Sequence, residues 1–519
     1  MTLSIGASVS SITTYFDNDF PKLKAEWEAS LLKELKITEL GHKGVKKQLD
    51  GTTWPTLSLD AKIQSQLDVK ESWKKASVTY ATVPLNKSKE WMKEDLAAGV
   101  RNFFFKCDFI GQEILMACLK ELSHFATPGE IEVFFLGEKK FIFGELPFKL
   151  IQNVCSGKDA HDQGGDIVLE LALLTSNLIE EPCTHIGVFV DSHFFNNIAK
   201  IRAAKLLSSR VQELLGKKND LRVVALTSYL DWTLYERYSN ILRNQTAVAS
   251  ALIAGADHIQ SSGYNILLDL ETQTAADEHT DRSRRMARNT SHVLALESML
   301  GVVKDAAYGS FHLENLTQYY CKAAWEKMQA MADGKHSFVA SAATVIRERR
   351  QELIRTRKHV QAGLNDFADR NERLRIVAKP GHGVMRTALE FEGLRLKVEK
   401  LKATPEVYVA LFGDYSALSG RLNFVKNYFE ILGLEVSDPK RSVIDVQEFQ
   451  NHLSAHQADV LVVCALDSDH PKLLACLGET KNEHKFLAGK TTVPGYTNLF
   501  VGQDVYETLN ELVSTWGTV

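Results

Sequence analysis

The sequence predicts an α/β protein in which a (β/α)8 barrel of the TIM type is followed by a smaller, flavodoxin-like α/β domain. Two observations predict this fold class. Short apolar runs alternate with amphipathic segments over roughly 300 residues, which implies a parallel sheet covered by helices. A second, shorter alternation begins after Pro405. The length of the first alternation favours a closed barrel over an open doubly wound sheet, although periodicity alone fits both.

The composition is that of a soluble globular protein. The 61 Lys and Arg residues are balanced by 65 Asp and Glu residues, so the formal charge is −4 and no basic excess exists for nucleic-acid binding. No stretch approaches the roughly 18 continuous apolar residues of a membrane span. We therefore expect neither a nucleic-acid nor a membrane partner. A chain of 519 residues exceeds one ordinary core and is expected to form two or three domains.

The cysteines and the first residues indicate a reduced, cytoplasmic protein. No cysteine pair has a CxxC or Cys/His spacing suited to zinc, so no metal site is predicted. Residues 1–20 contain no Arg and no sustained apolar run, which fits neither a secretory nor a mitochondrial targeting segment. His185 and His193 bracket an expected strand without a known ligand spacing and are interpreted as packing or surface residues. The cysteines are Cys107, Cys118, Cys155, Cys183, Cys321, Cys464 and Cys476.

The first part of the chain is divided into an N-terminal arm with an entry segment (1–94) and the barrel (95–375). Within the arm, residues 21–37 have apolar positions at helical spacing. The expected barrel strands are short and rich in Val, Ile and Phe, as buried parallel strands are. They are 100–107, 130–137, 185–191, 221–228 and 256–263. Helices are expected between them, among others at 110–122, 194–215 and 243–256.

A linker (376–404) is expected to separate the barrel from the C-terminal domain (405–519). It contains KPGHG (379–383), in which one Pro and two Gly interrupt any regular element. The expected strands of the second domain include 406–413, 435–437, 458–466 and 498–502. The expected helices are 422–433, 446–456, 471–478 and 504–516.

Several segments resemble the methylmalonyl-CoA mutase family. The most specific is RRMARNTSHVLALESMLGVVKDAAYGSFHLENLT (284–317), and the segments 194–207, 238–257 and 360–367 are also similar. The positions in 284–317 that match the family pattern are Arg288, Asn289, Thr290, Glu297, Ser298, Asp305, Gly309, Ser310, Glu314 and Thr317. The resemblance implies a radical carbon-skeleton rearrangement of an acyl-CoA with adenosylcobalamin, chemistry that the cofactor itself supplies.

The resemblance also shows where a cobalt ligand is missing. Members that bind the cofactor carry DxHxxG in the first βα turn of the C-terminal domain, and the histidine ligates cobalt while the aspartate orients it. Here the turn reads GDYSALSG (413–420). If Gly420 is the motif glycine, Ala417 takes the histidine position and Tyr415 the aspartate position, with Asp414 as a displaced remnant. This chain is therefore expected to bind no cobalamin.

Three other segments also depart from the family pattern. The barrel histidine that stabilises charge on the substrate thioester aligns with Val224, which offers no donor. The Ser-rich turn after the third strand of the C-terminal domain resembles ALDSDH (465–470), with Leu466 and Asp467 near the expected serines. The Gly-Pro-Gly-like turn resembles VGQD (501–504).

These departures predict a non-catalytic small subunit of a heterodimeric mutase. Its partner would be a paralogous large catalytic subunit that holds both adenosylcobalamin and the acyl-CoA, and the contribution of this chain would be an interface. The arm (1–94) is the candidate for wrapping the partner. Two alternatives remain at this point: an independent acyl-CoA-binding chain, and a regulatory or chaperone-like module that touches a mutase transiently.

Overall fold

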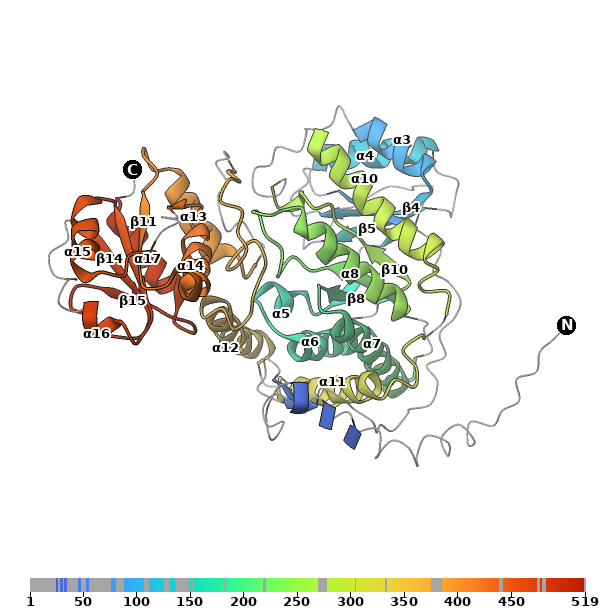
Figure 1. Ribbon diagram of the computed structural model, residues 1–519. Coiled ribbons are helices and arrows are strands. Elements are labelled where there is room, and N and C mark those ends of the chain that lie inside the picture. Colours follow the sequence, from blue (N-terminus) through green and yellow to red (C-terminus); the bar gives the residue numbers. More distant parts are fainter. Residues whose placement is uncertain are drawn as a thin grey trace.

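The computed structural model describes a larger lobe and a C-terminal lobe that are joined through one long helix (Figure 1). The described residues are 25–26, 29–30, 32–34, 45–47, 53–55, 76–80, 88–106, 112–125, 131–136, 149–151, 154–181, 183–217, 221–268, 278–303, 305–331, 334–374, 385–437, 442–473, 477 and 482–517. Residues 25–26, 29–30 and 32–34 are helical, as the spacing in 21–37 predicts. Most of the arm and the KPGHG segment lie outside the described residues.

The first sheet of the larger lobe has four parallel strands in chain order. They are β3 (Ala76–Tyr80), β4 (Val100–Lys106), β5 (Glu132–Leu136) and β6 (Lys149–Ile151). The three phenylalanines of β4 show why this strand forms, since alternate side chains of a strand face opposite ways. Phe103 and Phe105 pack under the helices α3 (Ser88–Ala97) and α4 (Gln112–Phe125), whereas Phe104 points to the opposite face.

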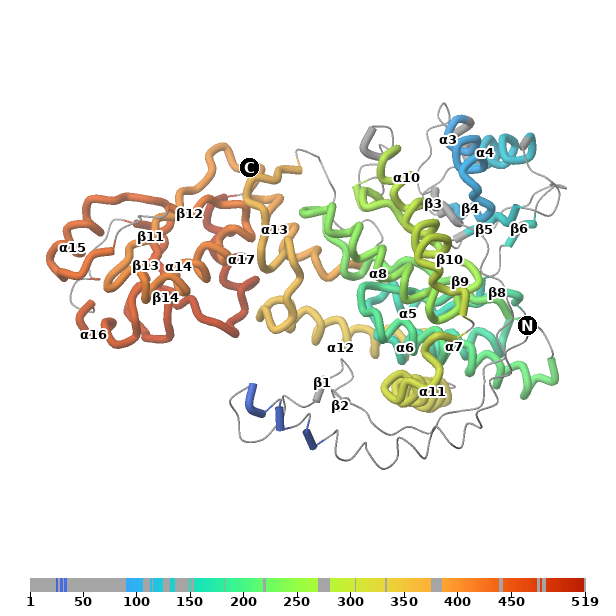
Figure 2. The backbone as a smooth tube through the Cα atoms, turned by 45° about the vertical axis from the view of Figure 1, so that its right-hand side comes forward, coloured from blue at the N-terminus to red at the C-terminus, as the bar shows by residue number. Residues whose placement is uncertain are grey.

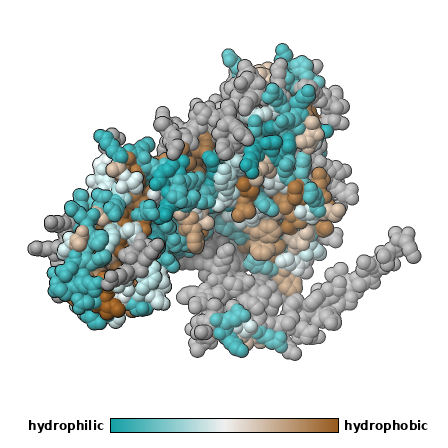
Figure 3. Space-filling view, turned by 45° about the horizontal axis from the view of Figure 1, so that its top comes forward, coloured by the Kyte–Doolittle hydropathy of each residue, from teal (hydrophilic) through white to brown (hydrophobic). Residues whose placement is uncertain are grey.

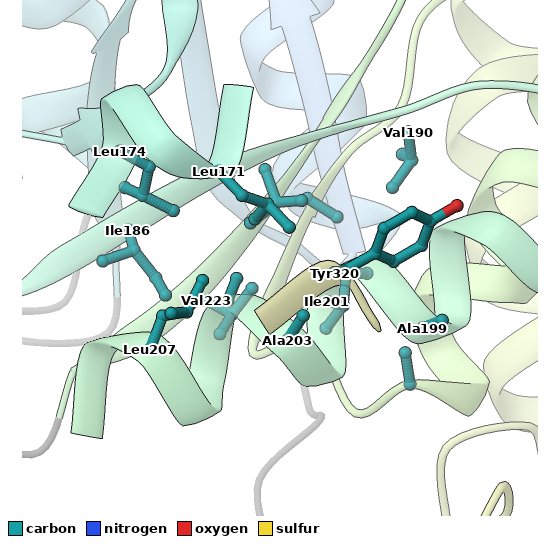
Figure 4. Packing of buried hydrophobic residues seen from close by; sticks show 14 of the residues in the cluster. Leu171, Leu174, Ile186, Val190, Ala199, Ile201, Ala203, Leu207, Val223 and Tyr320 are labelled. Atoms are coloured by element: carbon teal, nitrogen blue, oxygen red, sulfur yellow. The ribbon is translucent and has the colours of Figure 1, made fainter. Parts of the chain in front are cut away.

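The second sheet of the larger lobe is also parallel and four-stranded. It contains β7 (Val154–Ser156), β8 (His185–Val190), β9 (Arg222–Thr227) and β10 (His258–Gln260). The helices of this part are α5 (Lys158–Asp162), α6 (Ile167–Glu180), α7 (Phe194–Leu214), α8 (Ser239–Ile253), α10 (Glu278–His292) and α11 (Phe311–Ala330). A short π-helix, η2 (Val293–Glu297), follows α10. Figure 4 shows how side chains of the strands and of α6, α7 and α11 form one core, with Leu171, Ile186 and Tyr320 among them.

The two sheets face each other across a shared apolar interior. Phe104, Phe134 and Ile151 from the first sheet pack with Val224 and Leu226 from the second. The strand β10 also contacts β3. The expected closed barrel is nevertheless not found among the described residues, whose strands form two separate four-stranded sheets. Closure requires an unbroken ladder of hydrogen bonds, and β6, β7 and β10 at the edges have only three residues each.

The C-terminal lobe is built on a five-stranded parallel sheet. The strands are β11 (Val407–Phe412), β12 (Val436–Ser437), β13 (Val460–Ala465), β14 (His484–Ala488) and β15 (Thr497–Leu499). Their spatial order is β12-β11-β13-β14-β15, which in chain order is 2-1-3-4-5, one of the common doubly wound arrangements. The helices are α13 (Leu389–Glu399), α14 (Tyr415–Glu430), α15 (Val446–Ala455), α16 (His470–Leu473) and α17 (Val505–Thr515).

The alternation of side chains in β11 explains why helices cover both faces of this sheet. Val407, Val409 and Leu411 pack against α13, α14 and α17, whereas Tyr408 and Phe412 pack against α15 on the other face. The strand β14 is not among the strands expected by name. Its segment, HKFLA, opens with two polar, partly exposed residues, so the apolar run is too short to be recognised.

The helix α12 (Lys335–Arg355) connects the two lobes, as the tube in Figure 2 shows. Arg355 near its end forms an ion pair with Glu390 of α13. Arg357 donates to the carbonyl oxygen of Asn427 in α14 at 2.9 Å. Its guanidinium also lies 5.4 Å from the ring centre of Tyr428. Polar and aromatic contacts therefore dock the lobes beside their covalent connection.

Candidate functional site

Val224 lies in the packed interior between the two sheets of the larger lobe. Its backbone is flanked in register by Gly187 of β8 and His258 of β10, and its side chain is fully buried. The side chain packs in one apolar cluster with Phe104, Phe134 and Leu226. A valine methyl there offers no hydrogen-bond donor. The position aligned with the thioester-binding histidine is thus an apolar packing position.

Tyr415 and Ala417 occupy the first turn of α14, directly after β11, and Tyr415 is exposed. Asp414, the residue that resembles a displaced motif aspartate, is the N-cap of this helix. Its Oδ2 accepts from the amide nitrogen of Ala417 at 2.9 Å. An N-cap carboxylate satisfies an amide that the first helical turn leaves without a partner. Asp414 therefore has a structural role here, and the Ala417 methyl has no lone pair to offer a metal.

Arg421 bridges the carboxyl ends of β13 and β14. Its Nη1 donates to the carbonyl oxygens of Ala465 at 2.5 Å and Ala488 at 2.8 Å, and its Nη2 donates to Asp467 Oδ1 at 2.7 Å. Asp467 keeps a lowered carboxyl pKa because Arg421 bonds it. A Cβ atom on Gly489 would come within 3.3 Å of the guanidinium. This edge of the sheet, one turn of helix from Ala417, is closed by an arginine and its acceptors.

The remaining departures in the C-terminal lobe also serve the fold. The side chain of Gln503 accepts from the amide of Phe500 at 2.7 Å and donates to the Tyr428 hydroxyl at 2.7 Å. Asp504 caps α17 by accepting from the amide of Glu507 at 2.9 Å. These turn residues after β15 thus form local hydrogen bonds.

A cavity of about 550 Å³ lies in the larger lobe at the carboxyl ends of β8 and β9. This volume is in the range of small-molecule sites, and the carboxyl end of a parallel sheet is where such sites gather. Asp191 and Ser228 line the cavity from positions directly after these strands. Arg349 and Arg350 of α12 line its other side.

Two carboxylates in the cavity wall have opposite pKa shifts. Burial would raise the pKa of Asp191, but His193 beside it, with Nδ1 3.1 Å from Oδ1, lowers the pKa overall. Burial raises the pKa of Asp231, and the nearby charge of Asp191 raises it further. Ser192 donates to Asp231 from both its hydroxyl and its amide. The site therefore holds one carboxylate that stays ionised and one that is more readily protonated.

A second group of hydrogen-bonded side chains lies at the same cavity. The Ser228 Oγ lies 2.8 Å from His161 Nε2, and His161 Nδ1 lies 3.0 Å from Asp162 Oδ1. The imidazole is stacked on Phe189 of β8, with ring centres 3.8 Å apart and planes within 6°. The pKa of Asp162 is lowered to about 2, since bonds to His161 and Lys158 outweigh its burial. Asp162 is consequently a carboxylate at neutral pH.

The histidines that bracket β8 do not meet. His185 begins the strand and is buried, edge-on to Phe134 at 5.6 Å. His193 follows the strand at the opposite end, beside Asp191. No group of three or more His, Cys, Asp or Glu side chains within the described ranges is arranged to hold a metal ion.

Several motif residues of the 284–317 segment hold helices together. Arg202 of α7 forms ion pairs with Asp305 at 3.0 Å and Glu314 at 2.6 Å, and donates to Thr317 at 3.2 Å. The amide of Gly309 donates to the same Glu314 carboxylate at 3.2 Å. Gly309 has φ = +80°, a left-handed conformation that glycine adopts without a steric cost. These positions therefore stabilise the α7–α11 contact.

Arg288, another motif position, ties α10 to the helix α3. Its Nη1 lies 2.9 Å from Asp95 Oδ1, and Arg284 bonds the same buried carboxylate. Arg284 also lies 2.7 Å from Glu94. The motif thus marks a second inter-helix ion-pair network.

Sequence reasoning did not single out His161, Asp162, Ser228 or Arg421. His161 and Ser228 are 67 residues apart, and only the fold brings them together. A usable signal for Ser228 was its place at the carboxyl end of the expected strand 221–228. For Arg421, the only signal was its position next to the presumed motif glycine.

Comparison with known proteins shows which family this chain resembles. The family model described as methylmalonyl-CoA mutase matches residues 184–391. The small subunit of that enzyme from Porphyromonas gingivalis is 29% identical over 307 residues, 54% of this chain and 48% of that protein. The small subunit from Streptomyces virginiae is 32% identical, over 53% of this chain and 46% of that protein. The small subunit from Propionibacterium freudenreichii subsp. shermanii is 27% identical, over 69% and 62%.

The fold and the site define a parallel α/β protein with a polar cavity at the carboxyl ends of its strands. Within that class, the chain is similar to the methylmalonyl-CoA mutase family over residues 184–391, and to small subunits of that enzyme. It spans about half the length of the first curated relatives that it matches. None of the helices that the structure describes is long and apolar enough to cross a membrane.

Proposed function

We propose that this chain is the non-catalytic small subunit of an adenosylcobalamin-dependent methylmalonyl-CoA mutase, an isomerase that interconverts methylmalonyl-CoA and succinyl-CoA. A paralogous large subunit would hold adenosylcobalamin and the acyl-CoA, and the two chains would form a heterodimer in the cytoplasm. The similarity to three small subunits supports the assignment. The role of this chain would be to support the catalytic partner through an interface.

The observation that carries the proposal is that the residues present do not fit the cofactor. Ala417 has no metal-ligating atom, and Arg421 occupies the neighbouring strand ends through three hydrogen bonds. In the larger lobe, Val224 is packed where a charge-stabilising donor would be needed. On this proposal, two separate lobes would lack the groups on which the chemistry depends.

The proposal includes the finer fold. Residues 95–375 would form a (β/α)8 barrel, 376–404 a linker and 405–519 a degenerate cobalamin-binding domain of the flavodoxin-like kind. The two parallel sheets that share one apolar interior support the barrel, to which β3 of the entry segment adds a strand that contacts β10. The 2-1-3-4-5 strand order supports the second domain. A crystal structure of the heterodimer tests both assignments.

A titration tests whether the chain binds the cofactor. The purified chain is mixed with adenosylcobalamin, and the visible spectrum is followed for the red shift of a bound corrinoid. We expect no shift and no retention of cofactor after gel filtration. Stoichiometric binding would overturn the proposal.

Co-expression tests the heterodimer. A large mutase chain is expressed with and without this chain, and the products are separated by size-exclusion chromatography. We expect a stable one-to-one complex with mutase activity, and no mutase activity of the small chain by itself. A regulatory or chaperone-like module would not co-elute, and an independent acyl-CoA-binding chain would bind its ligand without the partner.

A further inference from the structure

The side chains of Ser228, His161 and Asp162 together have the geometry of an activated nucleophile. The Ser228 hydroxyl and His161 Nε2 are 2.8 Å apart, within direct proton-transfer distance. The opposite imidazole nitrogen is 3.0 Å from Asp162, a carboxylate that fixes the ring and its tautomer. The nucleophile, the base and the orienting carboxylate are the three parts that activate a serine.

Neighbouring groups hold these three side chains in place. Phe189 supports one face of the imidazole in a parallel stack. Ser228 is fixed by a backbone bond from its amide to Val190 at 2.8 Å, which ties it to the end of β8. Lys158 bonds Asp162 at 2.8 Å from the other side. Rigid support of this kind is what a reacting group requires.

The cavity beside Ser228 gives a substrate both space and charge. Ser228 and His161 line the volume of about 550 Å³ together with Arg349, Arg350 and Lys358, and carboxylates, among them Asp191 and Asp231, line it as well. Arg350 is anchored by bonds to the carbonyl oxygens of Gly164 and Gly165 at 2.7 Å and 3.2 Å. For Arg349, no ion pair is found within the part of the chain that the structure describes. The Arg349 guanidinium is therefore the group that would pair with a negative charge near the carbonyl group of a ligand.

We propose that Ser228, His161 and Asp162 cleave an activated carboxylic ester or thioester that carries a negatively charged group. This activity goes beyond the proposed subunit role, because it needs neither the partner nor cobalamin.

The steps balance with water as the only co-reactant. The Ser228 oxygen adds to the carbonyl carbon while its proton passes to His161 Nε2. The carbon–sulfur or carbon–oxygen bond then breaks, and the leaving group takes that proton. Water, deprotonated by His161, attacks the acyl-serine ester, and the serine hydroxyl and a free carboxylic acid are regenerated.

Covalent labelling tests the nucleophile. The full chain is incubated with a fluorophosphonate probe, and the modified residue is located by peptide mass spectrometry. We expect one probe per chain, on Ser228, and none in Ser228→Ala. Ser419→Ala is the matched control, since that hydroxyl is exposed on α14 and bonds the carbonyl oxygen of Ser416. Absence of labelling in the folded wild-type chain, or equal labelling of Ser228→Ala, overturns the proposal.

The base and the charge preference are tested by hydrolysis. Mono-4-nitrophenyl glutarate and the neutral 4-nitrophenyl valerate have similar length and differ in charge. His161→Gln keeps a hydrogen-bonding side chain but removes the base, so kcat is expected to fall about 100-fold or more. Arg349→Ala is expected to raise KM for the glutarate ester only. Unchanged kcat in a folded His161→Gln chain contradicts the mechanism, and equal KM changes for both esters contradict the charge preference.

Discussion

Arg202 joins two helices that are far apart in the sequence. It is 103 residues from Asp305 and 112 from Glu314, yet its guanidinium bonds both carboxylates. All three side chains are buried or nearly so. A buried carboxylate is expensive without its partner, so the network stabilises the α7–α11 packing only while it is complete.

Removing this arginine is expected to destabilise the larger lobe strongly. Arg202→Ala leaves two buried carboxylates without a cation, and the free energy of unfolding should fall by about 3–5 kcal/mol. Urea unfolding followed by circular dichroism measures it. Arg210→Ala is the matched control, because its ion pair with Glu213 is exposed and should contribute less than about 0.5 kcal/mol. Similar losses in both variants would contradict the role of the network.

His185 makes stability depend on pH. Burial lowers the pKa of this imidazole to about 4, and the neighbouring His258, Lys149 and Arg222 act in the same direction, whereas Glu132 opposes them. In the unfolded chain the pKa of a histidine is about 6.5. Between these values the unfolded state binds a proton that the folded state does not. The free energy of unfolding should therefore fall as the pH falls, by up to about 3 kcal/mol.

The pH effect is measured by urea unfolding at pH 7, 6, 5 and 4. His185→Gln should make the decline shallower, because the titrating group is gone. His124→Gln, at an exposed position on α4, should leave the decline as in the wild type. A slope that does not change in His185→Gln would assign the pH dependence to other groups.

Three helices of the C-terminal lobe begin at a capping aspartate. The helices α14, α15 and α17 each begin after an aspartate whose carboxylate accepts an amide of the first turn: Asp414, Asp445 and Asp504. All three helices follow strands or short turns of a parallel sheet, where the positive end of the helix faces the strand ends. The caps fix where each helix starts.

Substitutions of Asp414 test its role as the cap of α14. Asp414→Ala should lower the midpoint of thermal unfolding of the C-terminal lobe, with a loss of about 1 kcal/mol, because the Ala417 amide loses its acceptor. Asp414→Ser should retain most of the stability, since a serine also caps. Differential scanning calorimetry measures both. Equal destabilisation by Ala and Ser would show that Asp414 acts through something other than capping.

At the scale of the whole molecule, the exposed surface is uneven. In Figure 3, brown apolar patches gather on the larger lobe, while the C-terminal lobe is mostly teal. The larger lobe exposes Leu296, Met299, Val302 and Val303 from η2 and the turn after it, each more than 60% accessible. The described lobes meet through contacts of Arg357 and Arg355 and also through α13, which packs its Leu396 against Trp232 and Tyr235 of the larger lobe.

Removing the Arg357 contact is expected to weaken the coupling between the lobes. Arg357→Ala removes the bond to the Asn427 carbonyl and the stacking on Tyr428. Calorimetry should then resolve two unfolding transitions that lie further apart than in the wild type. The midpoint of the first transition should be a few degrees lower than in the wild type. Lys322→Ala, on the surface of α11, serves as the control. A single unshifted transition in Arg357→Ala would contradict this role.

Much of the fold was predictable because the local patterns are strong. The Phe run of β4, the apolar strands β8, β9 and β13, and the helices α7 and α17 all lie where the sequence predicts them. The three-residue strands β6 and β7 were not expected, and β14 was missed, since runs this short or this polar have no period to detect. The lost positions Val224, Tyr415 and Ala417 could be named in advance only through the family resemblance.

The sequence by itself determined the α/β class, the two alternations and the residues that depart from the family pattern. Those features depend on local periodicity and on residue type. Only the tertiary structure decided that Val224 packs with Phe104 and Phe134. The same holds for the hydrogen bonds of Arg421 to the ends of two strands, and for the hydrogen bond between His161 and Ser228. These contacts join residues from different elements, and packing in three dimensions, rather than neighbourhood along the chain, brings them within bonding distance.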